Sequence, residues 1–214
     1  RNLGTNMDEL KISWERDIDG YELTSRGEID ESIPGSGYRI TPKGGLIESY
    51  NPLKIDGLYR RLADSKLTPE AAIEFTNRYG FLTDTREIYR LKDKPPYLLL
   101  EIFYATVPKY RQLVKLIDKR KWNAIVRQIN TIAGFGAMRV GAEIDRDTNL
   151  PTLRFSPNSL LSVMDLQIIL DVTGGVQLRK CEFCPNWFKF GPGTGKRETA
   201  VYCSPRCQKA HQYQ

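Results

Sequence analysis

The spacing of the four cysteines, all of them near the C-terminal end, constrains this chain more than any other feature. Cys181 and Cys184 form a C-x2-C pair, and after eighteen intervening residues Cys203 and Cys207 form a C-x3-C pair. Two cysteines at the first spacing can turn both sulfurs toward one metal ion through a tight knuckle, and a second close pair completes a tetrahedron of thiolates. The pattern therefore predicts a small C-terminal module built around one structural Zn²⁺.

A redox pair or a disulfide is the alternative interpretation of the same cysteines. The chain opens with no apolar signal segment that would direct it to an oxidising compartment, and clustered pairs in such a chain favour a metal. His211, the single histidine, follows Cys207 by four residues and could replace one cysteine as a ligand. Because four cysteines already complete the shell, we expect His211 at the surface or facing DNA.

The residues around the cysteines predict the local structure of the module. Trp187 and Phe188 follow the first knuckle, where a small metal module needs apolar cover. The pair Val201–Tyr202 predicts a short strand before the second cysteine pair. Ser204 is a typical N-cap and Pro205 a typical first helical residue, so the last cysteine lies in the first turn of a helix. A knuckle, a hairpin and a helix carrying the last ligands make a treble-clef arrangement.

Most of the excess positive charge lies in the same part of the chain. The chain carries a net charge of +6, and the segment from Arg179 to Gln214, with seven basic and two acidic residues, holds +5 of it. Four thiolates and one Zn²⁺ leave this segment at about +3. A basic segment indicates an anionic partner, most commonly nucleic acid, or else serves as a solubilising tail. We expect five cations to contact phosphates: Lys189, Lys196, Arg197, Arg206 and Lys209.

The stretch from Gly191 to Lys196, Gly-Pro-Gly-Thr-Gly-Lys, is similar to a phosphate-binding loop of nucleotide-binding proteins. Such a loop requires G-x-x-x-x-G-K-[S/T], with a strand before it and a long helix after it. Here Phe190 occupies the first glycine position and Arg197 the Ser/Thr position. The stretch is therefore interpreted as a flexible, cationic hairpin tip and not as a nucleotide site.

The upstream chain predicts a scaffold with few strands. Residues 1–55 form a polar N-terminal segment with short extended pieces, residues 56–176 a mainly helical body, and residues 177–214 the zinc module. We expect extended pieces at 10–14 and 38–40, a hairpin of strands 138–144 and 152–155, and helices at 69–79, 95–121, 122–133 and 156–173. Pro108 predicts a kink or a break in the second helix. The fold class is α+β: a mostly helical body with a short β-hairpin, plus a C-terminal treble-clef-like zinc finger.

Catalytic signals in the body are poor, and we expect no enzyme. There is no H-x-x-x-H motif and no serine nucleophile elbow. Asp145 and Asp147 could suggest a metal-binding carboxylate pair, but their place in a turn explains them better. The aromatic residues Tyr97, Phe103, Tyr104 and Tyr110 indicate either core or the wall of a ligand pocket, with core favoured. A basic run offers either a solvated helix face or a second phosphate-contacting surface; it comprises Lys109, Arg111, Lys115, Lys119, Arg120 and Lys121.

The composition excludes a membrane-spanning helix. Mean hydropathy is −0.45, and no apolar run reaches the eighteen residues that a transmembrane helix needs. We therefore expect a cytoplasmic protein with no membrane partner.

Three stretches of the module together resemble a known family: Cys181-Glu-Phe-Cys-Pro-Asn-Trp-Phe188, Gly191-Pro-Gly-Thr-Gly-Lys-Arg197 and Tyr202-Cys-Ser-Pro-Arg-Cys207. They resemble the C-terminal zinc finger of bacterial CGNR-type proteins and their prophage-associated relatives, over about the last 36 residues. After Cys207 the chain reads Gln-Lys-Ala-His211, where the family's name-giving motif has Gly-Asn-Arg. Members are mostly described as transcription regulators.

The resemblance and the charge together imply a DNA-binding regulator whose body senses a ligand or partner. The alternative function is a phage- or defence-related adaptor whose finger binds another protein. A catalytic metal would need an open coordination position, which four cysteines do not leave.

Overall fold

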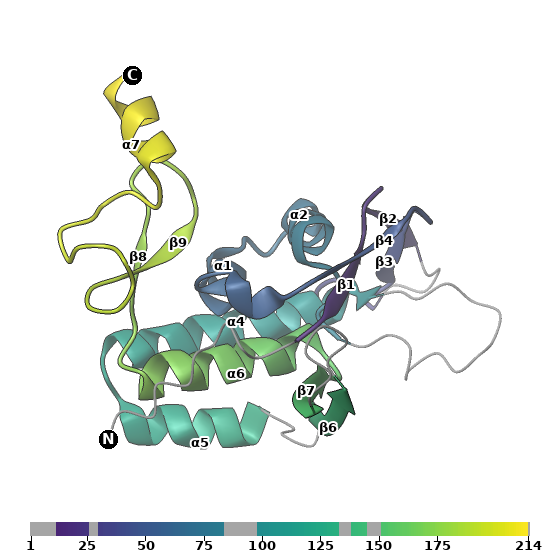
Figure 1. The fold of residues 1–214 in the computed structure, drawn as a ribbon. Coiled ribbons are helices and arrows are strands. Elements are labelled where there is room, and N and C mark those ends of the chain that lie inside the picture. The colour runs from purple at the N-terminus through teal and green to yellow at the C-terminus, as the bar shows by residue number, and fades with distance from the viewer. Residues whose placement is uncertain (1–11, 26–29, 84–97, 133–137, 145–150, 214) are drawn as a thin grey trace.

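The computed structural model describes residues 12–25, 30–83, 98–132, 138–144 and 151–213 (Figure 1). Within these ranges the chain forms six α-helices and four small antiparallel sheets, in agreement with the predicted α+β class. In the view of Figure 1, three long helices lie one above another, the strands of the first fifty residues stand at one end, and the cysteine-bearing module rises at the other.

The N-terminal part of the chain contains more regular strand than its polar sequence predicts. Strand β1 (Trp14–Asp17) pairs with β4 (Ile47–Tyr50), while β2 (Tyr21–Ser25) pairs with β3 (Tyr38–Pro42), which also carries the two-residue β5 (Leu98–Leu99). The extended piece predicted at 38–40 is confirmed as part of β3. The piece predicted at 10–14 reaches only the start of β1, and its first two residues lie outside the described ranges.

The helices of the body are α1 (Leu58–Asp64), α2 (Pro69–Tyr79), α4 (Leu100–Asp118), α5 (Trp122–Ile132) and α6 (Leu160–Thr173).

The predicted start of α2 is confirmed. The Thr68 hydroxyl caps the helix by accepting from the Ala71 N–H at 3.3 Å, and Pro69 is the first helical residue. Helix α4 begins at Leu100, later than predicted, since β5 occupies the two residues before it. It runs through Pro108 without the predicted break, and Pro108 itself is exposed.

The hairpin and the helix after it differ from the prediction at one boundary. Strand β6 (Met138–Ile144) pairs along its whole length with β7 (Pro151–Pro157), so the predicted hairpin is confirmed. The helix predicted to open at 156–157 instead begins at Leu160, because those two residues continue the ladder and pair with β6. Ser159 takes the capping role, and its hydroxyl accepts from the Ser162 N–H at 3.0 Å.

One main hydrophobic cluster joins the N-terminal strands to the helices of the body. Trp14, Tyr21 and Ile40 of the strands are buried together with side chains of α1, α2, α4 and α6. The aromatic residues Phe103 and Tyr110 are fully buried in this cluster, which confirms them as core. The predicted partner Tyr97 lies outside the described residues.

The C-terminal module comprises β8 (Gln177–Lys180), β9 (Trp187–Phe190) and α7 (Pro205–Gln212). Strands β8 and β9 form an antiparallel hairpin. The strand predicted at Val201–Tyr202 is absent, because this pair joins no ladder and only the Val201 carbonyl accepts a backbone bond, from Glu182, at 3.1 Å. Among the described residues, no helix combines the length and the apolar character needed to cross a membrane.

Candidate metal centre

Local structure brings the two cysteine pairs to one place. The turn that joins β8 to β9 carries Cys181 and Cys184, closed by the pairing of Lys180 with Trp187. At the other end of the module, the Ser204 hydroxyl accepts from the Cys207 N–H at 3.2 Å, the N-cap geometry that the sequence predicts. This cap fixes the last cysteine in the first turn of α7, beside the knuckle.

The four sulfurs lie close enough together to hold one metal ion. The Sγ of Cys184 lies 3.5 Å from that of Cys203 and 3.7 Å from that of Cys207, and the last two are 3.5 Å apart. All four, Cys181 included, lie within 4.8 Å of one another, and none forms a disulfide. Thiolates at about 2.3 Å from one Zn²⁺ are separated by about 3.8 Å in a tetrahedron, whereas disulfide sulfurs are about 2.0 Å apart. The residues therefore fit one metal ion.

The pKa values of the cysteine thiols also favour a bound cation. Burial raises the pKa of the Cys181 thiol, but backbone N–H groups, that of Cys203 among them at 3.3 Å, outweigh burial and lower this pKa to about 6. Burial, followed by the neighbouring thiols of Cys184 and Cys207, raises the pKa of Cys203 to about 12. Because thiolates so close together repel one another, a metal ion is needed to keep all four deprotonated.

His211 lies outside this cluster. Its Nδ1 is 3.0 Å from the Tyr202 hydroxyl, the two rings pack at 5.5 Å between centroids, and the side chain is exposed. The predicted surface position of His211 is confirmed, and the cysteines alone make up the candidate ligand set.

Lys189 points into the body of the protein. Its Nζ lies 3.5 Å from a carboxylate oxygen of Asp171 on α6, and its side chain is only 17% exposed. Burial raises the pKa of Asp171 to about 6, against the lowering effect of Lys189. A phosphate would have to displace this ion pair, so the geometry does not favour Lys189 as a nucleic-acid contact.

Lys196 supports the cysteine knuckles from within the module. Its Nζ donates to the Cys203 carbonyl at 2.5 Å and lies 5.4 Å from the centroid of the buried Phe188 ring. The predicted apolar cover is thus present at Phe188. Trp187 instead packs against the body, with the Arg60 guanidinium 4.8 Å from the centroid of its ring.

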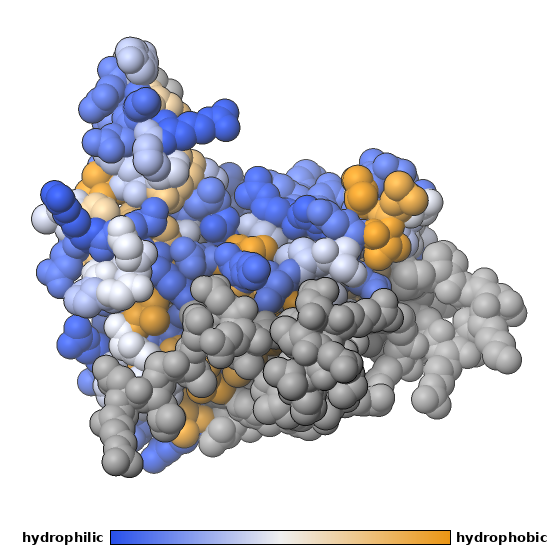
Figure 2. All heavy atoms as spheres, viewed as in Figure 1, coloured by the Kyte–Doolittle hydropathy of each residue, from blue (hydrophilic) through white to orange (hydrophobic). Residues whose placement is uncertain are grey.

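The remaining three predicted contacts are exposed. Arg197 lies in the loop before the second cysteine pair, and Arg206 and Lys209 lie on α7, three residues apart and thus on one side of the helix. Within the described residues, none of the three has an ion-pair partner. In Figure 2 the surface of the module is mostly hydrophilic.

The glycine-rich stretch forms the predicted hairpin tip. The Gly191 N–H donates to the Lys196 carbonyl at 2.9 Å, and Gly191, Gly193 and Gly195 all adopt positive φ. No helix follows until α7, so the arrangement of a nucleotide-binding loop is absent from this described segment. The carboxylates Asp145 and Asp147 lie outside the described residues.

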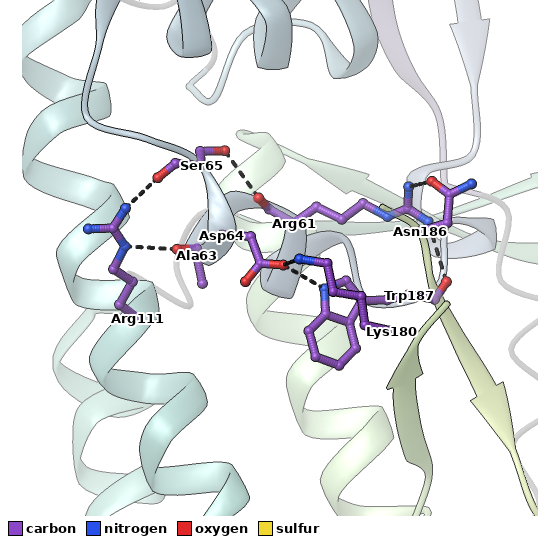
Figure 3. Close-up of polar contacts among 8 residues, drawn as sticks. All are labelled: Arg61, Ala63, Asp64, Ser65, Arg111, Lys180, Asn186 and Trp187. Atoms are coloured by element: carbon purple, nitrogen blue, oxygen red, sulfur yellow. Dashed lines mark hydrogen bonds and ion pairs between the residues drawn. The ribbon is translucent and has the colours of Figure 1, made fainter. Parts of the chain in front are cut away.

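The residues that attach the module to the body carry no signal in the sequence (Figure 3). The Asp64 carboxylate of α1 accepts from Lys180 Nζ at 2.8 Å and from Trp187 Nε1 at 3.1 Å. Arg61 donates to the Asn186 side chain at 2.5 Å. These partners are more than a hundred residues apart in the chain, and no local pattern of residues announces such a pairing.

Comparisons with protein-family models, with curated proteins and with solved structures gave no match. The kinship with CGNR-type proteins therefore stays a prediction from the residues of the module.

Proposed function

We propose that this chain is a nucleic-acid-binding protein, with DNA as the favoured target, whose module is a treble-clef-like finger folded around one Zn²⁺. The observation that carries the proposal is the clustering of Cys181, Cys184, Cys203 and Cys207, whose sulfurs lie within 4.8 Å of one another in the most cationic part of the chain. Four thiolates suit Zn²⁺ and leave no open coordination position, so the metal's part is to hold the module together. The resemblance to CGNR-type regulators supports a role in transcription.

The contacts that we propose are fewer than the sequence predicts. Arg197, Arg206 and Lys209 are exposed around the metal centre, and α7 offers two of these cations on one side for the phosphates of a duplex. Lys196 acts indirectly, through its bond to the Cys203 carbonyl. Lys189 serves the attachment of the module to α6. Because phosphate contacts carry no sequence information, this surface explains affinity and orientation.

A salt titration of duplex binding tests this function. Each lost phosphate contact lowers the slope of log affinity against log salt by about 0.9 on duplex DNA. Arg197→Ala combined with Arg206→Ala should therefore flatten the slope by roughly 1.8 and weaken binding across unrelated sequences. The matched control replaces two exposed lysines of the N-terminal part, Lys43→Ala with Lys54→Ala, and should leave the slope unchanged. Native mass spectrometry should find one zinc per chain in both variants.

A protein adaptor is the second candidate function. The Phe183 ring in the first knuckle is 37% exposed and Tyr213, after α7, is 88% exposed, and aromatic rings are typical of protein contacts. Absence of any salt-dependent duplex binding by the zinc-loaded chain would overturn the nucleic-acid proposal and leave the adaptor as the better explanation.

A further inference from the structure

A cationic groove of about 920 Å³ lies where α4 ends and α5 begins. Its basic residues are Lys109, Arg120, Lys121 and Arg127, and none of the described residues that line it is acidic. The nearby Asp118 carboxylate instead pairs with Arg60 at 2.8 Å. The groove therefore offers a positive surface to an anionic partner.

An exposed tryptophan lies among these cations. Trp122, the first residue of α5, is 46% exposed and lines the groove, while Trp14 is buried and Trp187 is held by Asp64. Gln112 and Asn123 add amide groups to the same wall, and the partly buried Leu116 belongs to its lining. An indole, amides and cations together form the kind of surface on which unpaired bases stack while their phosphates are neutralised.

The backbone at Arg120 is the second independent observation. With φ of 52°, Arg120 is the one non-glycine residue with positive φ in the described part of the chain. It ends α4 in a Schellman turn, in which the Lys121 N–H donates to the Leu116 carbonyl and the Arg120 N–H to the Ile117 carbonyl, each at 2.9 Å. Glycine is the preferred residue at this position, so the backbone of an arginine here is more strained than that of a glycine would be. Arg120 lines the groove in spite of this cost.

The other cations of the basic run divide into two groups. Arg111 is turned toward the end of α1, where it donates to the Ala63 and Ser65 carbonyls (Figure 3). Lys115 and Lys119 are exposed but do not line the groove. Only part of the basic run therefore lines the groove, where residues of both α4 and α5 surround Trp122.

We infer that this groove binds single-stranded nucleic acid, with a base stacked on Trp122 and phosphates held by Arg120, Lys121 and Lys109. A duplex fits the geometry less well, because its bases are already stacked and cannot reach the indole. The inference does not rest on the function of the finger, because in Figure 1 α5 lies on the opposite side of α4 and α6 from α7.

Binding of fluorescein-labelled oligo(dT) to the zinc-loaded full chain tests the inference, followed by anisotropy. Trp122→Ala should weaken binding about fivefold to 150-fold, the usual cost of losing one stacked base. Trp122→Tyr keeps a stacking ring and should restore most of the affinity. Oligo(dT) should quench the tryptophan fluorescence of the parent and leave that of Trp122→Tyr almost unchanged.

Arg120→Gly separates the groove from a structural role of this residue. Glycine suits the positive φ, so thermal scans should give the same or a higher Tm than the parent, while oligo(dT) binds several-fold more weakly. Lys119→Ala is the matched control, because it removes the neighbouring exposed cation outside the groove, and it should retain the parent's affinity. Arg197→Ala with Arg206→Ala should also retain it, which keeps this test distinct from that of the finger.

Three results would overturn the inference. The first is no measurable oligo(dT) binding by the parent. The second is unchanged affinity in both Trp122→Ala and Arg120→Gly. The third is an equal loss in Arg120→Gly and Lys119→Ala, which would indicate attraction by overall charge and not a groove.

Discussion

Two buried carboxylates of α6 show how single residues set the pH response of this protein. Asp165 is 4% exposed and accepts a hydrogen bond from the Tyr110 hydroxyl at 2.8 Å, while Asp171 pairs with Lys189. Burial raises the pKa of Asp165 to about 6, and the bond from Tyr110 only partly offsets this rise. Since no cation partners Asp165 among the described residues, its ionisation in the folded state is costly.

Asp165→Asn should therefore reduce the pH dependence of stability. The pKa is near 3.9 in the unfolded chain and about 6 in the folded one, so the folded state binds the proton more tightly. In the parent, protonated Asp165 therefore stabilises the folded state. This stabilisation is fully present below pH 4 and is lost as the pH rises through 6, which lowers the free energy of unfolding by about 2–3 kcal/mol. Asparagine stays neutral and can still accept from Tyr110.

Urea denaturation at pH 4, 5, 6 and 7 measures this difference. The fall in unfolding free energy from pH 4 to pH 7 should be smaller in Asp165→Asn than in the parent. Glu31→Gln, at an exposed acid, serves as the control and should follow the parent. Parallel curves for Asp165→Asn and the parent would show that Asp165 does not titrate in this range.

At the scale of elements, the module depends on its cysteines and the body on its own core. Strands β8 and β9, the glycine-rich tip and α7 bury little apolar surface apart from Phe188, and no residue of α7 is buried. The main hydrophobic cluster lies instead in the body. A metal ion that joined the two cysteine pairs would supply the cross-link that a segment this small needs.

Cys203→Ser should release the metal and unfold the module while the body stays folded. Hydrogen exchange should become fast in β8, β9 and α7 but remain slow in α4 and α6. His211→Ser is the matched control, because the imidazole contacts Tyr202 outside the cluster, and this variant should keep both its metal and its exchange protection. Metal loss in His211→Ser would show that the histidine is a ligand.

Local signals and distant contacts explain which elements could be predicted. The caps at Thr68 and Ser204, like the cysteine pairs, act over three or four residues, so the sequence displays them directly. The ladder partner that keeps Pro157 in a strand is Met138, and the anchor of Lys189 is Asp171. Such partners are fixed by the packing of the whole chain, and for this reason neither the start of α6 nor the ion pair of Lys189 could be predicted from the sequence.

In the whole molecule, the two proposed binding surfaces belong to different structural elements. The module is attached to α1 through Asp64 and Arg61, and its exposed cations lie around the cysteine cluster. The groove at Trp122 belongs to α4 and α5, and α4 belongs to the main core. None of the described residues that line the groove belongs to the module. Folding of the finger and shape of the groove should therefore be separable.

Removal of the metal should abolish duplex binding but leave oligo(dT) binding almost unchanged. A zinc chelator should unfold the finger, because the module loses the cross-link between its two cysteine pairs, and duplex binding through Arg197, Arg206 and Lys209 should be lost with it. Oligo(dT) binding through the body should stay within about twofold of the zinc-loaded chain, since stacking on Trp122 needs no metal. Anisotropy titrations with duplex and with oligo(dT), before and after chelation and again after added Zn²⁺, measure both. Loss of both affinities together would mean that the finger and the groove form one surface, whereas recovery of duplex binding alone on adding zinc is the expected result.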